Sequence, residues 1–383
     1  MEKLKLFVVA GEFSGDMHGA AVVEELSQNY EIELYGTGGP KLAALGQTQF
    51  ATVNDMSVMG FVPVLKKLPY FLGLGKKLER ELLKIKPDLV LLVDYTGFNL
   101  RFAKRIRKHG FPAVELVAPQ VWIWHHSRVK TMRYAFDKVL AILPFEEEYL
   151  KKYGVNAVYI GHPLVAGLTP KVKDRDDFCR VTGLDPDKPV IGLVPGSRPK
   201  EIANLMPVFM DALAVFAEKY PDYQYVLARA ASVSEEVLHD YIKDNPVKIV
   251  TGLTPDVMRY AQMLWICSGT ATLEAAIIGT PMILLYKVPV LDEFIVKRLT
   301  TLRMIGMPNI ISGKQIVPEL QMKACNPVTL VEHAEEMREN LSIYKERLRP
   351  ISAMFEGKEP IKNAAAEIIE TLKSLKVMKD QDH

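Results

Sequence analysis

The sequence is poor in cysteine, in net charge and in long apolar runs, and each shortage excludes a class of protein. Its 383 residues include three cysteines, Cys179, Cys267 and Cys325, and no C-x-x-C pair, so we expect neither a disulfide framework nor a zinc site. The adjacent His125 and His126 also lack metal-ligand spacing. A formal net charge of +2 argues against nucleic acid as a partner. No apolar run reaches the roughly 20 residues that cross a bilayer. We therefore expect a cytoplasmic protein that meets a membrane only at its surface.

What the sequence does contain is a repeated alternation of short apolar strands and amphipathic helices. Strands with few polar residues are typical of a parallel sheet that is covered on both faces. Their alternation with helices predicts a doubly wound α/β fold. The predicted strands form two series: 5–11, 31–39, 87–95, 112–119, 138–143 and 157–163, then 189–194, 224–230, 247–252, 262–269 and 280–287.

The length and the two series predict two Rossmann-like domains, residues 1–167 and 168–348. The polar stretch 168–188 is the predicted linker. One last helix is expected from about residue 349 to the end. Because ligands bind beyond the carboxyl ends of parallel strands, we expect the binding site in a cleft between the domains.

Two strand-to-helix turns in the second domain are candidate phosphate sites. In 193–202 a helix is predicted to begin next to Arg198 and Glu201, and in 266–281 another begins after a run of small residues. Free N–H groups at such helix starts bind anions, and Glu274 could accept two ribose hydroxyls. The alternatives are an N-capped helix beside a surface arginine and a local capping box. The residues assigned to the nucleotide are Gly196, Ser197, Arg198, Glu201, Ser268, Gly269, Thr270, Ala271 and Glu274.

Two candidates lie in the first domain. Asp94 ends a predicted buried strand, where a carboxylate could be a general base for a hydroxyl nucleophile or a structural hydrogen-bond acceptor. The turn 8–20 has its glycines four residues apart, unlike the dinucleotide pattern G-x-G-x-x-G. We expect Ser14, Asp16 and His18 to face an acceptor substrate. Close packing of a helix on a strand is the other explanation of these glycines.

The stretch 57–80 combines a dense apolar face with a charge of +4. This combination is typical of a helix that lies in a membrane interface, although a core helix with solvated lysines has the same composition. The residues predicted to contact membrane or acyl chains are Phe61, Val64, Leu65, Lys66, Lys67, Leu68, Tyr70, Phe71, Leu72, Lys76 and Lys77.

Ten blocks, in order along nearly the whole chain, resemble the lipid-A-disaccharide synthases, inverting glycosyltransferases of the GT-B type from Gram-negative bacteria. The blocks are AGEFSGDMHGA, GTGGPKLAALG, MSVMGFVPVL, VDYTGFN, APQVWIWHHSRV, LPFEEEYLKKYGV, GHPLV, PGSRPKEI, SGTATLEAAIIGTPM and PNIISGKQIVPELQ. The chain departs from the family at Gly97, where a second acid is usual, and at Pro63, where a glutamate is usual.

The resemblance implies transfer of 2,3-diacylglucosamine from UDP to the 6-hydroxyl of 2,3-diacylglucosamine 1-phosphate, giving a β-1,6-linked disaccharide 1-phosphate and UDP. It implies Asp94 as general base, Arg198 as a UDP contact that stabilises the leaving diphosphate, and Asn309 as a further residue near UDP. No metal or cofactor is implied. The inner face of the cytoplasmic membrane is the implied location, a homodimer is a common form, and the last helix would pack back on the first domain.

Two other functions fit the same features. A sugar-nucleotide epimerase shares the two-domain plan and the UDP pocket but needs no exposed basic, apolar stretch. A non-catalytic UDP-sugar or lipid binder on a GT-B scaffold would fit the missing second acid at Gly97. Release of UDP that depends on the acceptor would separate both from a glycosyltransferase.

Overall fold

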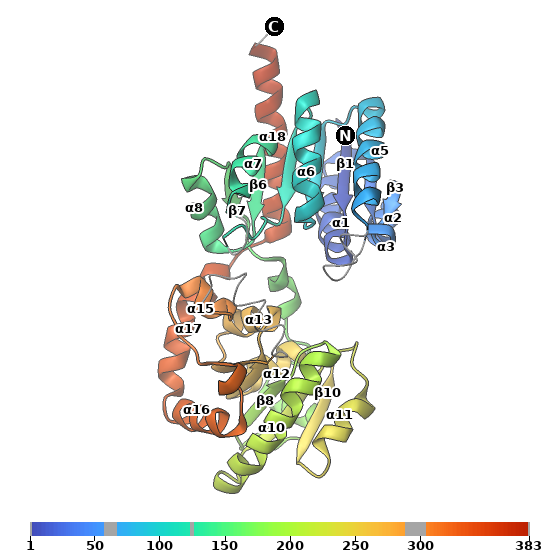
Figure 1. Ribbon diagram of the computed structural model, residues 1–383. Coiled ribbons are helices and arrows are strands. Elements are labelled where there is room, and N and C mark those ends of the chain that lie inside the picture. Colours follow the sequence, from blue (N-terminus) through green and yellow to red (C-terminus); the bar gives the residue numbers. More distant parts are fainter. Residues whose placement is uncertain (1, 57–66, 123–125, 288–303, 382–383) are drawn as a thin grey trace. The chain divides into compact units, whose positions relative to one another are not determined.

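The computed structural model describes residues 2–56, 67–122, 126–287 and 304–381. They form two units, the first made of residues 1–163 and 357–383 and the second of residues 164–356. Each is a parallel sheet with helices on its faces (Figure 1), which confirms the predicted doubly wound α/β architecture.

The sheet of the first unit has the strand order β3-β2-β1-β4-β5-β6-β7. Its two faces are packed by separate apolar clusters. One contains Leu78 of α5 and Phe102 of α6, and the other contains Val22 of α1 and Ile368 of α18. The strands are β1 (Glu2–Ala10), β2 (Tyr30–Gly38), β3 (Thr48–Thr52), β4 (Leu89–Val93), β5 (Ala113–Leu116), β6 (Lys138–Ala141) and β7 (Ala157–Tyr159). The helices are α1 (Phe13–Ser27), α2 (Pro40–Ala44), α3 (Val53–Met56), α5 (Leu68–Ile85), α6 (Thr96–Ile106), α7 (Arg128–Ala135), α8 (Pro144–Lys152) and α18 (Pro360–Gln381).

The sheet of the second unit has the order β10-β9-β8-β11-β12-β13. Its central strands β8 and β11 are buried along their whole length. The strands are β8 (Val190–Val194), β9 (Gln224–Arg229), β10 (Val247–Thr251), β11 (Met263–Cys267), β12 (Met282–Tyr286) and β13 (Glu319–Gln321). The helices are α9 (Arg175–Thr182), α10 (Pro199–Lys219), α11 (Glu235–Ile242), α12 (Thr254–Tyr260), α13 (Thr270–Ile278), α15 (Met307–Ser312), α16 (Pro327–Glu339) and α17 (Leu341–Phe355).

The predicted linker 168–188 is wrong. The chain passes between the units at Pro163 and Leu164, and most of that polar stretch is folded within the second unit. Helix α9 begins after Asp174, whose side chain accepts a hydrogen bond from the Asp177 N–H at 2.9 Å. Its Phe178 side chain is completely buried. Helix α9 was not predicted because most of its residues are charged or polar, and it is held by a short buried side made of Phe178, Cys179 and Thr182.

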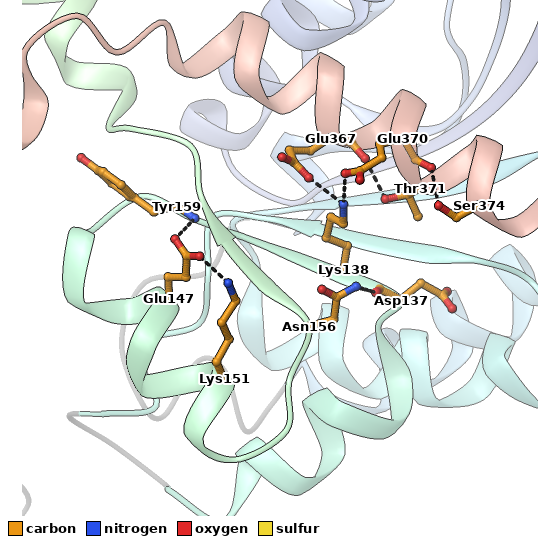
Figure 2. A network of polar contacts seen from close by, with 10 residues as sticks. All are labelled: Asp137, Lys138, Glu147, Lys151, Asn156, Tyr159, Glu367, Glu370, Thr371 and Ser374. Carbon is orange, nitrogen blue, oxygen red and sulfur yellow. Dashed lines mark hydrogen bonds and ion pairs between the residues drawn. The ribbon is translucent and has the colours of Figure 1, made fainter.

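The predicted single helix after residue 349 is also two separate elements. Residues 349–355 end α17 in the second unit, and α18 belongs to the first. Lys138 of β6 explains part of the docking of α18, because its ammonium group bonds Glu367 at 2.6 Å and Glu370 at 2.7 Å (Figure 2). The side chain of Lys138 is only 11% exposed, so these ion pairs are better shielded from solvent than most surface pairs.

Candidate functional site

Asp94 lies directly after the central strand β4 and has an unusual backbone. Its φ angle is +42°, a region that residues other than glycine rarely adopt and that is enriched at functional sites. The Asp94 N–H donates to the Leu116 carbonyl at 3.0 Å, and the Ser14 hydroxyl donates to Asp94 Oδ2 at 3.4 Å. Burial, reinforced by the nearby Glu12 carboxylate, raises the pKa of Asp94 to about 6. A carboxylate with this pKa is ionised at neutral pH and is more basic than a surface aspartate.

Glu12 is a neighbour of Asp94 that was not among the residues predicted from the sequence. This exposed side chain stands at the start of α1 and adds a negative charge beside Asp94. Its signal was available, since it is an acid that directly follows Gly11 at the end of an apolar strand.

The glycines of the turn 8–20 allow close packing. A Cβ atom on Gly11 would lie 2.4 Å from the Tyr95 ring, and one on Gly15 would lie 3.1 Å from the Val93 carbonyl oxygen. Tyr95 is held in this place by its hydroxyl, which donates to the Met56 carbonyl at 2.9 Å. The structure thus supports the packing explanation of this turn and shows how α1 approaches β4 closely enough for Ser14 to reach Asp94.

Asp16 is a structural residue, contrary to its assignment to the acceptor. Its side chain is 1% exposed. Its oxygens accept the N–H groups of Gly39, Lys41 and Leu42 at 2.7, 2.9 and 3.1 Å, which satisfies the start of α2. The burial of Asp16 and these three bonds indicate that its side chain holds the start of α2 in place.

His18 of α1 affects the charge of the nearby His162, just after β7. Burial lowers the pKa of His18. Burial and the neighbouring His18 lower the pKa of His162 to about 4. Both imidazoles are therefore neutral at neutral pH, which suits them to donate or accept hydrogen bonds but not to hold a phosphate by charge.

At the first predicted phosphate turn, the helix start is occupied by the protein's own carboxylate. Glu201 Oε2 accepts the N–H groups of Ser197 and Arg198 at 3.1 and 3.2 Å. A Cβ atom on Gly196, whose φ is +102°, would lie 2.4 Å from the same oxygen. The Arg198 guanidinium lies 3.4 Å from Glu201 Oε1, and its side chain is 79% exposed. Glu201 therefore caps α10 and is not placed to hold a diphosphate, whereas Arg198 projects into solvent.

At the second predicted phosphate turn, the helix start is open. Gly269 and Thr270 are exposed, and among the described residues, apart from the chain neighbours of Gly269, no atom lies within 4 Å of a Cβ built on Gly269. The Thr272 hydroxyl donates to the Gly269 carbonyl at 2.7 Å, and Ser268 bonds the Ile305 carbonyl at 3.3 Å. Glu274 is half-buried, and burial raises its pKa. The N–H groups of Thr270 and Ala271 have no acceptor among the described contacts.

Asn309, which the resemblance places near UDP, uses its side chain for bonds within the protein. It is completely buried. Its Oδ1 accepts from Ile316 N–H at 2.7 Å and Val317 N–H at 3.0 Å. Its Nδ2 donates to the Val317 carbonyl at 2.9 Å and to Glu319 at 2.7 Å. Asn309 braces the loop that leads into β13.

In the described part of the stretch 57–80, some apolar side chains are buried in the core and others are exposed at the surface. Helix α5 buries Leu74, Leu78 and Leu82 against the sheet but leaves Tyr70 39% and Leu72 50% exposed. Leu68 is also exposed, and Phe71 is partly buried against the same core. Lys67 and Lys77 donate to the carbonyls of Asp55 and Phe50, and Lys76 is exposed. Phe61, Val64, Leu65 and Lys66 lie outside the described residues.

Among the described residues, no group of three or more histidine, cysteine, aspartate or glutamate side chains could hold a metal ion. Within the same residues, no helix combines the length and the low charge that a membrane span requires.

Solved structures with the same fold include three enzymes that use or transfer sugars. The glycotransferase of kitacinnamycin matches with a TM-score of 0.64 and 13% identity, over 97% of this chain and all of that one. The calicheamicin glycosyltransferase CalG4 has a TM-score of 0.62 and 18% identity, over 98% of this chain and 100% of that one. The UDP-GlcNAc 2-epimerase from Neisseria meningitidis has a TM-score of 0.60 and 14% identity, over 97% and 100%. These likenesses define the fold, which is that of a GT-B glycosyltransferase.

The particular family follows from the sequence. The family model described as lipid-A-disaccharide synthetase matches residues 6–372. The lipid-A-disaccharide synthase of Syntrophus aciditrophicus is 38% identical over 85% of this chain and 86% of that protein. That of Geobacter sulfurreducens is 34% identical over 90% of this chain and 93% of that protein. The chain belongs to the lipid-A-disaccharide synthase family, which are hexosyltransferases, and this separates it from the epimerases that share its fold.

Proposed function

We propose that this protein joins UDP-2,3-diacylglucosamine to 2,3-diacylglucosamine 1-phosphate, with Asp94 as the general base. The observation that carries the proposal is the half-buried carboxylate of Asp94, with its raised pKa and positive φ angle, directly after the central strand of the first unit. Asp94 takes the proton from the acceptor 6-hydroxyl while that oxygen forms a bond to the anomeric carbon of the donor. The bond from this carbon to the diphosphate breaks, and UDP leaves with the electron pair. One displacement of this kind inverts the anomeric centre.

The second unit is proposed to bind the nucleotide. The open N-terminus of α13 offers N–H groups and the positive end of the helix dipole to the diphosphate. Arg198 supplies a charge-assisted, forked contact to the same group. Such donors stabilise the negative charge of the leaving diphosphate.

The test measures UDP release from UDP-2,3-diacylglucosamine, with and without the acceptor. We expect release only when the acceptor is present. Asp94→Asn should lower kcat by at least about 1,000-fold while UDP still binds, and the exposed Asp211→Asn on α10 should change kcat by less than twofold. In the unaltered protein, kcat/KM should fall about tenfold per pH unit below the Asp94 pKa of about 6, because the base becomes protonated.

Other outcomes have defined meanings. Release without acceptor would indicate a hydrolase or epimerase chemistry. UDP binding without any release would indicate a binding protein on this scaffold. Near-normal turnover of Asp94→Asn would remove Asp94 as the base.

The exposed apolar end of α5 is proposed to contact the inner face of the cytoplasmic membrane of a Gram-negative bacterium, where acylated substrates reside. Leu72→Glu should lower binding to vesicles of anionic phospholipid about tenfold or more, because it places a charge on the contact face. Val215→Glu, an equally exposed apolar position on α10, is the matched control. Equal effects of both changes would contradict this contact. The homodimer implied by the resemblance can be tested by sedimentation.

A further inference from the structure

An acid and an amide are paired inside the apolar core beneath Asp94. Glu115 lies on β5, in register with Leu92 of β4 and Val139 of β6, and both neighbours belong to an apolar cluster. Asn99 lies on α6. Both side chains are completely buried. Asn99 Nδ2 donates a hydrogen bond to Glu115 Oε1 at 3.1 Å.

The other oxygen of each side chain is left without a partner. Asn99 Oδ1 and Glu115 Oε2 are buried, and neither has a hydrogen-bond donor among the described residues. An unsatisfied buried polar atom is costly, and two together in one pair need an explanation. Both atoms are acceptors when Glu115 is ionised, so they cannot bond each other. One proton on Glu115 Oε2 would make that atom a donor, and a bond from it to Asn99 Oδ1 would satisfy both atoms and close a ring of two hydrogen bonds.

We propose that Glu115 is a protonated positioning residue, whose ring of two hydrogen bonds with Asn99 fixes the main chain that presents Asp94. The protonation follows from the pair itself, and the positioning role rests on the proposed function of Asp94. Burial also raises the pKa of Glu115 well above its usual value, and the nearby Asp94 carboxylate adds to this shift.

The ring links the two elements that hold residues 94 and 95. The residue after Glu115 accepts the Asp94 N–H through its carbonyl, at 3.0 Å. On the other side, the Asn99 N–H donates to the Tyr95 carbonyl at 2.9 Å. The ring therefore joins α6 to β5, and these two elements hold the backbone of Asp94, which has the positive φ angle, and of the next residue, Tyr95. A strained conformation persists only where its surroundings hold it.

A neutral Glu115 also suits the charges around it. The carboxylate whose charge acts on Glu115 is that of Asp94, after β4, and Asp94 in turn lies near the carboxylate of Glu12, from the turn before α1. On α7, the side chains in the same cluster are the apolar Val129, Met132 and Ala135, and on β6 the neighbour in register is Val139. An ionised Glu115 would place a third negative charge in this region with no cation to balance it among these groups.

The first arm of the test observes the proton directly and needs no turnover. The infrared spectrum of the full-length protein is recorded at about pH 8.5, above the pKa of Asp94 (about 6) and of Glu146 (about 7), so that both are mostly ionised. We expect the carbonyl stretch of a buried carboxylic acid, shifted when Asn99→Leu removes its partner. The band should disappear in Glu115→Gln and remain in Asp94→Asn. Its absence from the unaltered protein would overturn the protonated ring.

The second arm tests positioning. Glu115→Leu breaks the ring and should lower kcat about 10- to 100-fold with little change in KM, since misplaced catalytic groups lose rate more than binding. Glu115→Gln keeps both hydrogen bonds, because its amide donates where the acid did, and should restore turnover to within about threefold. In the Asp94→Asn background, Glu115→Leu should cause no further loss, as expected for two residues that act together.

The outcomes separate the two proposals. If Asp94→Asn retains turnover, the role of Asp94 fails, and the infrared band still decides the ring. If Asp94→Asn is inactive but Glu115→Leu and Glu115→Gln lose the same activity, the positioning role fails and Asp94 stands.

Discussion

The helix starts of α10 and α13 have similar sequence signatures and different structures. Both follow a buried strand of the same sheet through a turn of small residues. At α10, Glu201 bonds two N–H groups of the turn. At α13, the acid one turn into the helix is Glu274, for which no bond to the helix start is found among the described contacts, and Gly269 and Thr270 remain exposed.

The difference lies in the position of one carboxylate along each helix. Glu201 is the third residue of α10, where a side chain can fold back on the preceding N–H groups as in a capping box. Glu274 is the fifth residue of α13, too far along to do this. An acid at the third position closes an anion site, whereas an acid later in the helix leaves it open. The two turns should therefore contribute unequally to UDP binding, α10 through the Arg198 side chain and α13 through its backbone.

The largest effect expected at these two helix starts tests the contribution of α10. Arg198→Ala should lower kcat/KM about 100-fold or more, because the exposed guanidinium is the part of this turn that can reach a diphosphate. Lys200→Ala, which removes an exposed cation two residues away, should change kcat/KM by less than about threefold. Steady-state UDP release measures both variants. Equal losses would mean that the turn contributes only general positive charge.

A somewhat smaller effect tests whether the N-terminus of α13 is open to a diphosphate. Thr270→Asp places a carboxylate at the exposed first residue of the helix, where it should compete with a diphosphate and weaken UDP binding about 100-fold by calorimetry. The substitution favours the helix itself, because acids stabilise helix starts, so unfolding does not explain a loss. Ser234→Asp at the start of α11 is the matched control and should leave the UDP Kd within about twofold. An unchanged Kd for Thr270→Asp would show that the nucleotide does not use α13.

The sequence predicts strands better than it predicts which side chains are free. Apolar runs identified the central strands, but β3 (TQFAT) and β13 (ELQ) were missed because neither contains such a run. Asp94 was found from its place after a buried strand, whereas its φ angle and raised pKa depend on Leu116, Ser14 and Glu12, which lie elsewhere in the chain.

Sequence patterns do not show whether a polar side chain is already hydrogen-bonded within the protein. Asp16 and Asn309 have the polar character of ligand-binding residues, yet the oxygens of each accept N–H groups from other segments, at 39–42 and 316–317. Such bonds join residues up to 26 positions apart, so no local motif reveals them. The Glu115 in the apolar run AVELV is the opposite case, since an acid in a buried strand is visible in the sequence but its partner Asn99 is not.

The smallest expected effect tests whether α10 is closed to the diphosphate. Glu201→Gln keeps an oxygen that can accept the N–H groups of Ser197 and Arg198 but removes the negative charge. If the diphosphate sits at α13, the change only relieves a repulsion across solvent, and UDP binding should tighten by less than about tenfold. Glu218→Gln, an exposed acid at the far end of the same helix, should have no measurable effect. Tightening of more than about 100-fold would mean that Glu201 competes with the diphosphate for the same N–H groups, and the two helix starts would then differ in their free states but not in their bound ones.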